Sequence, residues 1–441
     1  MKRQRLQIHL DRKASSVKKR QARKKRTVRR YRKLIRQRRK KRSLKSKSLR
    51  RAIRKKKIWR PKPRPAPMKH MEVQTVHLHD DRPKGLYRTT AEWAQHSRLR
   101  GEDPVFMEFH TNETFHFTES NGLESPLFPD QVKSLPPAFV AVIREGRVLG
   151  EEGSVITPDN RLLWDVSLRM VPEDQHPAFT TTPTRPLIET AETVAVLSFF
   201  SSQTYFHWLY DVLARIHLLR LSGIVVDKYV INRNIPSQFQ DETLAMLGIP
   251  SDKVLFTHPT MNLKAQQLVV ASISMHSFLE YASWPFQFIR QELYEKQNIR
   301  HTGCDRIYIS RFKSDKRKIL NEDQVTSLLD EYGFSTVALE ELSVAQQIET
   351  FSSASVIVAP HGSGLANLAF CSPGTKIIEI FARDYTPVCY WEMSNYLRLD
   401  YYSMVENGYH EPNQQHLFEL NILVSVDRLK QLLNLAGVSR L

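Results

Sequence analysis

The stretch Val358–Phe381, VAPHGSGLANLAFCSPGTKIIEIF, decides the fold class of this chain. It opens with an apolar run typical of a buried strand and passes through the small-residue turn His361–Gly364 into a helix expected near Leu365. It ends in a second apolar run that contains Glu379. Strand, tight turn, helix and strand in this order form a βαβ unit with two parallel strands.

Ligands of such sheets bind beyond the carboxyl ends of the strands. The turn carries several residues suited to an anion there: His361, Gly362, Ser363 and Gly364. Its two glycines allow close approach and a positive φ, and the amides at a helix start favour a phosphate or pyrophosphate. We expect Asn367 to belong to this site. Glu379, at the same edge, is expected to accept hydrogen bonds from ribose hydroxyls; the alternative is a plain turn with Glu379 in solvent.

Strands and helices alternate on both sides of this stretch, which indicates an α/β fold with parallel sheets. Before it we expect a β-meander over 138–164, strands at 194–200, 229–231, 254–256 and 268–271, and helices at 205–222, 237–247 and 285–297. After residue 305 we expect strands at 306–310, 334–338, 356–359, 376–380 and 399–404, with helices at 321–332, 343–352 and 387–397. The break near 298–305 divides the body into two Rossmann-like halves, 72–297 and 298–441, that face a cleft.

A second anion-suited element is the strand Arg306–Arg311, RIYISR. Its last residue places a guanidinium at the carboxyl edge of a neighbouring strand, where it could bind a phosphate with two hydrogen bonds. The alternative is a surface arginine. We favour the phosphate role because two anion-suited elements then converge on one edge.

The expected helix 205–222 carries His207, Asp211 and Arg215 at spacings of four residues, on one face of an otherwise apolar segment. Ionisable groups in such surroundings are costly unless they are paired or functional. One interpretation is a structural ion pair between Asp211 and Arg215. The other makes Asp211, or His207 as the second choice, a general base that faces the cleft.

Several patterns are absent from the sequence: a D-x-D triplet, a Walker loop, a G-x-G-x-x-G after a strand and an H-E-x-x-H. The scattered histidines lack metal-ligand spacing, so we expect no metal site. Three cysteines without paired spacing argue for a reducing compartment. We also find no apolar window long enough for a membrane span, and no signal-peptide core, which together predict a cytoplasmic body.

The charge of the chain is concentrated at one end. Residues 1–70 contain 34 Lys and Arg against one acid, which leaves a mildly acidic body of net charge −13. We expect 1–67 to be a disordered or helical basic arm that ends in a Pro-rich spacer. Its partner would be an anionic lipid surface, with nucleic acid as the second choice. The alternative is a solvated tail without a role, or a start assigned too far upstream.

Three motifs together resemble glycosyltransferase family 61, including its bacterial capsular-polysaccharide type: FHWLYDVLARIHLL, RIYISR and VIVAPHGSGLANLAFCSPGTKIIEIF. The meander GSVITPDNRLLWDVS is similar to the segment that precedes the first core strand in that family. The resemblance covers residues 135–405. It implies a GT-B-like pair of Rossmann domains and inverting transfer of a hexosyl or pentosyl group from a nucleotide sugar to a hydroxyl of a glycan or lipid-linked acceptor, without an essential metal or other cofactor.

Carried over residue by residue, the resemblance implies that Arg311 and His361–Gly364 surround the diphosphate, that Glu379 lies near the ribose and that His207 and Asp211 face them across the cleft. Eukaryotic members lie in the secretory pathway behind a membrane anchor, whereas this chain has a polybasic arm. We therefore expect a cytoplasmic enzyme of capsular or cell-surface polysaccharide synthesis, peripheral at the inner face of the membrane. The alternatives are an epimerase-like enzyme that modifies the nucleotide sugar, and a non-catalytic scaffold that binds membrane or nucleic acid.

Overall fold

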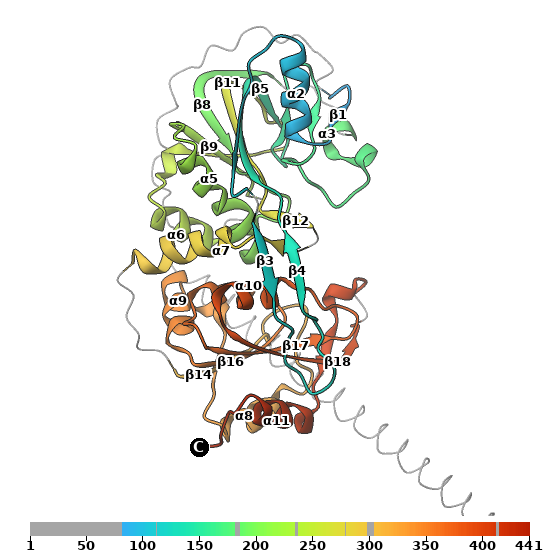
Figure 1. Cartoon of the computed structure of the whole chain (residues 1–441), viewed down its shortest axis with the longest axis vertical. Helices are drawn as coiled ribbons and strands as arrows, with labels where there is room; N and C mark the ends of the chain where they lie inside the picture. Colours follow the sequence, from blue (N-terminus) through green and yellow to red (C-terminus); the bar gives the residue numbers. More distant parts are fainter. Residues whose placement is uncertain are drawn as a thin grey trace, which may run out of the picture. The chain divides into compact units, whose positions relative to one another are not determined.

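The computed structural model describes residues 82–111, 113–180, 186–233, 237–277, 279–297, 304–411 and 414–441. The predictions about the arm 1–67 lie outside these residues, as does most of the expected break near 298–305. The described residues form two large sheets with helices packed against them, which confirms the α/β class (Figure 1).

The first sheet is mixed, with strand order β1-β7-β6-β5-β11-β8-β9-β10 and β2 paired to β5. Its strands are β1 (Leu86–Tyr87), β2 (Val105–Phe109), β5 (Ala138–Leu149), β6 (Ser154–Ile156), β7 (Leu162–Leu163), β8 (Ile188–Val196), β9 (Lys228–Ile231), β10 (Val254–Phe256) and β11 (Asn262–Ala271). Strands β11, β8, β9 and β10 pair in parallel, whereas β5 is antiparallel to β2, β6 and β11. Only part of this half therefore matches the Rossmann-like expectation.

The second sheet has the order β15-β14-β16-β17-β18-β19, and only β19 is antiparallel to its neighbour. Its strands are β14 (Arg306–Ile309), β15 (Ser335–Val337), β16 (Val356–Pro360), β17 (Lys376–Ala382), β18 (Asp400–Tyr409) and β19 (Asn421–Leu423). Numbered along the chain, the parallel strands run 2-1-3-4-5, the order of a doubly wound sheet. The crossovers change direction between β14 and β16, where such sheets bind their ligands.

Helices cover both faces of the second sheet because their apolar stripes face it. Buried residues of α8 and α11 pack on one face, and those of α9 and α10 on the other (Figure 1). The helices are α2 (Thr90–Leu99), α3 (Pro177–Thr180), α4 (Tyr205–His207), α5 (Arg215–Leu221), α6 (Gln238–Met246), α7 (Trp284–Arg290), α8 (Glu322–Asp330), α9 (Val344–Ser353), α10 (Cys389–Leu397) and α11 (Val426–Leu435). Short 3-10 segments are η1 (Glu173–Gln175), η3 (Ser251–Lys253), η5 (Leu339–Glu341), η6 (Ser363–Phe370) and η7 (Leu417–Glu419).

Two helices contain π turns, η2 (Trp208–Leu213) and η4 (Gln291–Glu295). The first interrupts the helix that the sequence predicts as a regular one over 205–222. The expected meander over 138–164 also differs, because its first strand, β5, runs unbroken from Ala138 to Leu149. Glu145 has φ 57° there, and its neighbours stay paired to β11, so the pattern marks an irregularity within one strand.

One hydrophobic core extends through both sheets. It joins Leu209 and Leu213 of the first half to Ile357 and Phe370 of the second. The strands β3 (Thr114–Phe117) and β4 (Gln131–Ser134) form a hairpin, and Phe128 in the segment that joins them stacks on Trp391 of α10, with ring centroids 5.2 Å apart. The halves are thus in direct contact where the sequence predicts a cleft, and a GT-B-like arrangement stays a prediction.

Candidate functional site

Arg311 and Gly362 meet at the direction change of the second sheet. Arg311 follows β14, and Gly362 follows β16, the adjacent parallel strand. A Cβ built on Gly362 would lie 2.9 Å from Arg311 Cζ and closer still to Nη1. The glycine therefore leaves the space that the guanidinium occupies, and the two elements converge on one edge as the sequence predicts.

Two further cations, Lys316 and Arg317, come from the loop after Arg311. The Arg311 guanidinium donates to Ser314 Oγ at 2.8 Å and to the Lys316 carbonyl at 3.1 Å. Arg317 donates from Nε to the His361 carbonyl at 3.0 Å and from Nη1 to the Phe418 carbonyl. Within the described part of the chain, none of these three cations forms an ion pair with a carboxylate.

Burial and mutual repulsion make this cluster costly when no anion is present. Burial, with the charge of Arg317 beside it, lowers the pKa of Arg311 to about 10. The pKa values of Lys316 and Arg317 are lowered too, chiefly by burial. Neutral acceptors satisfy hydrogen-bonding capacity but leave the positive charge uncompensated, so the cluster suits an anion with more than one charge.

The backbone of the turn adds donors to this cluster. The first hydrogen bond inside η6 runs from the Leu365 amide to the Gly362 carbonyl at 2.9 Å, so the amides of Ser363 and Gly364 precede it. The predicted positive φ is wrong, because Gly362 has φ 170° and Gly364 is not among the residues with positive φ. The lack of a Cβ instead leaves space at both glycines. Gly362 makes room for Arg311, and Gly364 makes room for Leu339, whose Cδ1 would lie 2.6 Å from a Cβ built on Gly364.

His361 is buried beside the turn and is oriented by a carboxyl group. Its Nδ1 lies 2.5 Å from Glu379 Oε1, and Tyr401 donates its hydroxyl to Glu379 Oε2 at 2.5 Å. Burial, with Arg317 and Arg311 nearby, holds the pKa of His361 well below its usual value. Burial raises the pKa of Glu379 to about 8. The imidazole is therefore neutral, and the pair holds one proton.

The expected position of Glu379 is corrected by these contacts. The sequence places its carboxylate at an open edge, ready for ribose hydroxyls, but the side chain is fully buried and both oxygens are engaged. The Glu379 side chain can be buried on its strand because His361 and Tyr401 provide hydrogen-bond partners for its two oxygens.

Asn367 is likewise corrected. Its side chain is fully buried, donates to Gln347 Oε1 at 2.9 Å and to the Gly364 carbonyl at 3.0 Å, and accepts from Tyr205 at 3.0 Å. Both N–H groups and the oxygen of its amide have hydrogen-bond partners within the protein. Asn367 therefore fastens η6 to α4 of the first half and is not open to a donor.

His207 and Asp211 form a hydrogen-bonded pair on the π-turn helix. His207 Nδ1 lies 2.7 Å from Asp211 Oδ2, which also accepts from Tyr281 at 2.8 Å, and Asp211 Oδ1 accepts from the Met275 amide at 3.2 Å. Asp211 is fully buried, whereas the His207 side chain keeps 16% of its exposure. The histidine is thus the accessible member and the aspartate its orienting partner.

The expected ion pair between Asp211 and Arg215 is wrong. Arg215 is buried and donates to the carbonyls of Val196, Leu197 and Ser198, at the carboxyl end of β8. Burial lowers its pKa to about 10. The π turn advances fewer degrees per residue than an α turn, so Arg215 leaves the stripe that the regular spacing predicts.

The two candidate clusters adjoin through packed elements. Helix α4 packs against η6, and Tyr210 donates to the Ala366 carbonyl at 2.6 Å. The Phe206 ring lies 5.5 Å from Tyr390, whose own ring lies 5.3 Å from His361. The histidine pair and the cationic turn therefore belong to one continuous region of the molecule.

Sequence reasoning missed several members of this region. Lys316 and Arg317 stand in the basic run KSDKRK, which Phe312 separates from RIYISR, and this run could have indicated them. Tyr281, Tyr390 and Tyr401 carry no local pattern, because their roles depend on contacts between segments that are distant in sequence.

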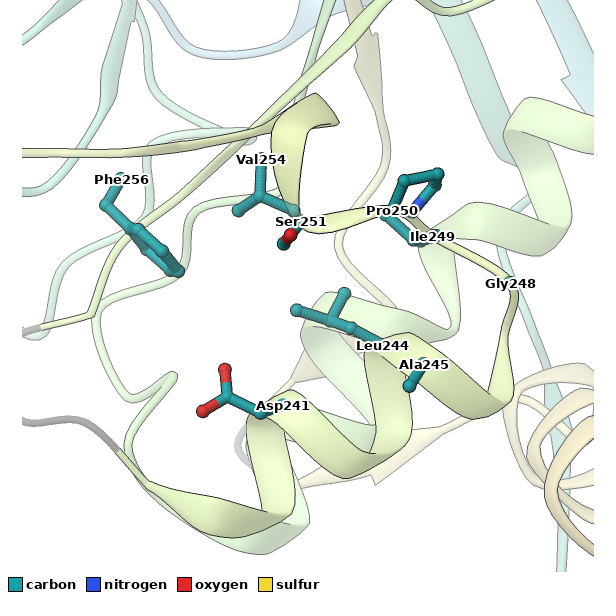
Figure 2. Close-up of a pocket in the computed structure, with 9 residues that line it drawn as sticks. All are labelled: Asp241, Leu244, Ala245, Gly248, Ile249, Pro250, Ser251, Val254 and Phe256. Atoms are coloured by element: carbon teal, nitrogen blue, oxygen red, sulfur yellow. The ribbon is translucent and has the colours of Figure 1, made fainter. Parts of the chain in front are cut away.

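Other features lie apart from this region. A pocket of ≈ 520 Å³ on the first half is lined by α6 and the segment that follows it, with Asp241 and Phe256 at its rim (Figure 2). None of the predicted site residues lines it. In the parts of the chain given above, no cluster of three or more His, Cys, Asp or Glu suits a metal, and none of the helices has the length and apolarity of a membrane span.

Comparison with known proteins agrees with the motifs. Residues 205–378 match the model of the family Glycosyltransferase 61. Protein O-linked-mannose beta-1,4-N-acetylglucosaminyltransferase 2 is 36% identical over 95 residues in Tetraodon nigroviridis and 34% over 93 residues in Homo sapiens. These matches cover 20% of this chain and only 16% of each relative. The segment that holds the histidine pair and the cationic turn is therefore similar to glycosyltransferase family 61.

Proposed function

We propose that the protein is an inverting glycosyltransferase that moves a hexosyl or pentosyl group from a nucleotide sugar to a hydroxyl acceptor. The observation that carries the proposal is the cationic cluster of Arg311, Lys316 and Arg317, packed against Gly362 at the point where doubly wound sheets bind nucleotides. The match of residues 205–378 to a glycosyltransferase family supports the same activity.

The cluster is suited to the diphosphate of the donor. Arg311 and Arg317 are held by carbonyl oxygens, and the amides of Ser363 and Gly364 lie at the same turn. Fixed donors of this kind stabilise negative charge as it develops on a leaving group. We propose that they neutralise the departing nucleoside diphosphate without an essential metal.

His207 is the better candidate for the base, in place of Asp211. A base must reach the proton that it removes, and Asp211 is fully buried with three hydrogen-bond donors already on its carboxylate. Because Asp211 accepts the hydrogen bond from Nδ1 of His207, the other ring nitrogen, Nε2, is left to receive a proton. Asp211 then stabilises the imidazolium that forms, as in other histidine–carboxylate pairs.

In the reaction, the acceptor oxygen attacks the anomeric carbon from the face opposite the diphosphate. The new carbon–oxygen bond forms as the bond to the diphosphate oxygen breaks, and the electron pair leaves with the nucleoside diphosphate. The hydroxyl proton passes to His207 Nε2. One displacement inverts the anomeric configuration and requires no redox partner.

The relatives indicate which sugar donor should be tested first. Their name gives transfer of N-acetylglucosamine to O-linked mannose, so a nucleotide-activated N-acetylglucosamine belongs first in a donor panel. A glycan or lipid-linked hydroxyl of capsular or cell-surface polysaccharide synthesis, met at the inner face of the membrane, remains our proposed acceptor.

The test is binding followed by transfer. Full-length protein is titrated with the diphosphates of uridine, guanosine, adenosine and cytidine by calorimetry, with and without EDTA, and then incubated with the radiolabelled nucleotide sugars of the base that binds. We expect micromolar binding of one diphosphate, unchanged by EDTA, and release of labelled sugar. Binding that disappears with EDTA contradicts the metal-free mechanism.

Two other outcomes would replace the proposal. Conversion of the nucleotide sugar to an isomer, with its diphosphate intact, would indicate an epimerase-like enzyme. Failure to bind any nucleoside diphosphate would leave a non-catalytic protein. For binding tests of Arg311→Met, the matched control is Arg306→Met. Arg306 begins the strand that Arg311 follows, and it donates to the carbonyls of Tyr332 and Ser439 at the opposite end of that strand.

A further inference from the structure

Tyr281 joins the histidine pair to a second buried cluster of charged side chains. Tyr281 is 1% exposed on the short strand β13 (Glu280–Tyr281), which pairs with β12 (Met275–Ser277). Its hydroxyl donates to Asp211 Oδ2 at 2.8 Å, the same oxygen that faces His207 Nδ1. The hydroxyl and the imidazole thus share one acceptor.

Helix α10 holds the backbone of Tyr281 on both sides. The Tyr281 amide donates to Glu392 Oε2 at 3.3 Å, and the Tyr281 carbonyl accepts from the Tyr396 hydroxyl at 3.0 Å. Glu392 is itself fixed, because Lys133 of β4 donates to its Oε1 at 2.6 Å and to Glu280 Oε1 at 2.6 Å. Hydrogen bonds to the peptide groups on both sides of Tyr281 leave the phenol little freedom to move away from Asp211.

The same helix reaches the cationic turn. Tyr390 of α10 donates its hydroxyl to the Gly362 carbonyl at 2.8 Å. The residue that contacts the anion-binding turn, Tyr390, therefore lies on the same helix as Glu392 and Tyr396, which hold Tyr281. A displacement of α10 would move both clusters together.

We propose that Tyr281 is the positioning residue of the His207–Asp211 pair, and that α10 sets its place through Glu392 and Tyr396. The inference rests on the proposed function in that His207 acts there as the base. Tyr281 touches no substrate in this account. It fixes the rotamer of Asp211 and draws electron density from the carboxylate, which limits how strongly Asp211 holds the protonated imidazole.

The substitution that tests this is Tyr281→Phe, which removes one oxygen and keeps the ring packed on Phe206 and Phe286. Without the phenol, Asp211 becomes a stronger acceptor for the imidazolium, so the acid limb of the kcat/KM profile should move to higher pH. We expect kcat to fall about tenfold at neutral pH, because Asp211 loses the hydrogen bond that fixes its rotamer, and one hydrogen bond to a charged group has an effect of about that size. The KM for the nucleotide sugar should stay unchanged.

Tyr87→Phe is the matched control. Tyr87 is 4% exposed and donates its hydroxyl to the carboxylate of Asp159 at 2.7 Å, on β1 at the edge of the first sheet. It loses the same bond to the same kind of acceptor, far from His207 in the topology. Its pH profile should match the wild type even if its thermal stability falls as much as that of Tyr281→Phe.

Tests on α10 separate positioning from general stability. Glu392→Gln keeps an acceptor for the Tyr281 amide and should retain most activity, whereas Glu392→Leu should behave as Tyr281→Phe does. Among the side chains that the structure describes, the charged or titratable groups that face Asp211 are His207 and Arg215 from its own helix segment and Tyr281 from β13. Arg169 is a further charged group in this part of the molecule. It lies over the ring of Phe200, which is a neighbour of His207, and it forms an ion pair with Glu152.

A readout without activity keeps the inference separate from the proposed function. In full-length protein labelled with ¹⁵N-histidine, the spectrum of His207→Gln identifies the ring signals of His207. We expect Tyr281→Phe to move the titration of these signals to higher pH and Tyr87→Phe to leave it in place. An unmoved His207 titration in Tyr281→Phe overturns the positioning role. A moved titration in a protein that transfers no sugar supports the positioning role and overturns only the proposed function.

Discussion

Arg311 illustrates a conflict between stability and binding at the level of one side chain. A buried guanidinium without a carboxylate partner destabilises the unliganded fold, and burial lowers its pKa to about 10 for that reason. A neutral, apolar side chain of similar length would remove that cost and would also remove the anion's partner. Stability and affinity should therefore respond to substitution in opposite directions.

We predict that Arg311→Met raises the unfolding free energy of the unliganded protein by about 1–2 kcal/mol, after the lost hydrogen bonds are subtracted. The same variant should bind the nucleoside diphosphate about 10- to 100-fold more weakly, the usual effect of losing a charge-assisted hydrogen bond. Urea unfolding and calorimetry measure the two quantities. A variant that is less stable and binds normally would assign Arg311 a structural role.

The His361–Glu379 pair predicts a pH dependence of stability. In the folded state the pair holds one proton up to about pH 8, because the pKa of Glu379 is raised to about 8 and that of His361 is lowered. In the unfolded state the two groups release their protons near their ordinary values, 4.5 and 6.5. Between pH 6.5 and 8 the folded state therefore binds one proton more, and stability falls as pH rises.

The expected loss across that window is about 2 kcal/mol, measured as the unfolding free energy in urea at pH 6.5, 7.25 and 8. Between pH 4.5 and 6.5 both states hold one proton, so this pair contributes no slope there. Glu379→Gln cannot release a proton and should lose the slope between pH 6.5 and 8. An identical slope in the variant would place the titration elsewhere.

At the scale of elements, the turn after β16 depends on space at Gly362. Its φ of 170° is extended backbone that any residue adopts, so the backbone itself does not demand glycine. We predict that Gly362→Ala displaces the Arg311 guanidinium and weakens diphosphate binding about tenfold, with little change in melting temperature. Gly85→Ala is the control, because its Cβ would meet the guanidinium of Arg161 at 3.4 Å, an ordinary contact. Equal binding by both variants would show that Arg311 can move freely.

Most helices and strands could be predicted because each carries its own periodic pattern. The βαβ series after residue 305 has buried apolar strands and amphipathic helices, and the expected ranges agree with β14 to β18 within a few residues. Strand β19 and helix α11 were not predicted, although the helix has a clear apolar stripe at Leu429, Leu432 and Leu433. Both elements lie beyond residue 405, where the family resemblance ends.

The candidate site could be predicted only in part. Arg311 and Gly362 meet as expected because strand order and residue type fix which side chains reach one sheet edge. The surroundings of Glu379 and Asn367 could not be predicted, because a polar residue in such a segment can either bind a ligand or form a hydrogen bond with a buried side chain. Here the buried partners are Tyr401 for Glu379 and Tyr205 for Asn367. The π turn has no sequence signature, so the change of stripe at Arg215 was also beyond prediction.

At the scale of the whole molecule, one hydrophobic cluster contains residues of both sheets, and each sheet also has a cluster of its own. Phe128, from the segment after the β3 strand, stacks on Trp391 at 5.2 Å and meets Phe381 edge-on at 6.1 Å. Tyr205 and Tyr210 of the first half donate to Asn367 and Ala366 of the second. Neither sheet has a separate set of core residues at this contact, so the halves should unfold together.

We predict that Phe128→Ala destabilises the protein by about 3–5 kcal/mol, the usual cost of deleting a buried aromatic ring, and that unfolding remains a single transition. Near-UV circular dichroism follows the packing of the aromatic side chains, Trp391 among them, and far-UV circular dichroism follows the secondary structure of both halves, so the two curves should coincide in urea. Leu99→Ala, on the exposed end of α2, should change stability by less than about 0.5 kcal/mol. Two separate transitions, only one of them shifted by Phe128→Ala, would mean that the halves are independent domains, in agreement with the two separate halves that the sequence predicts.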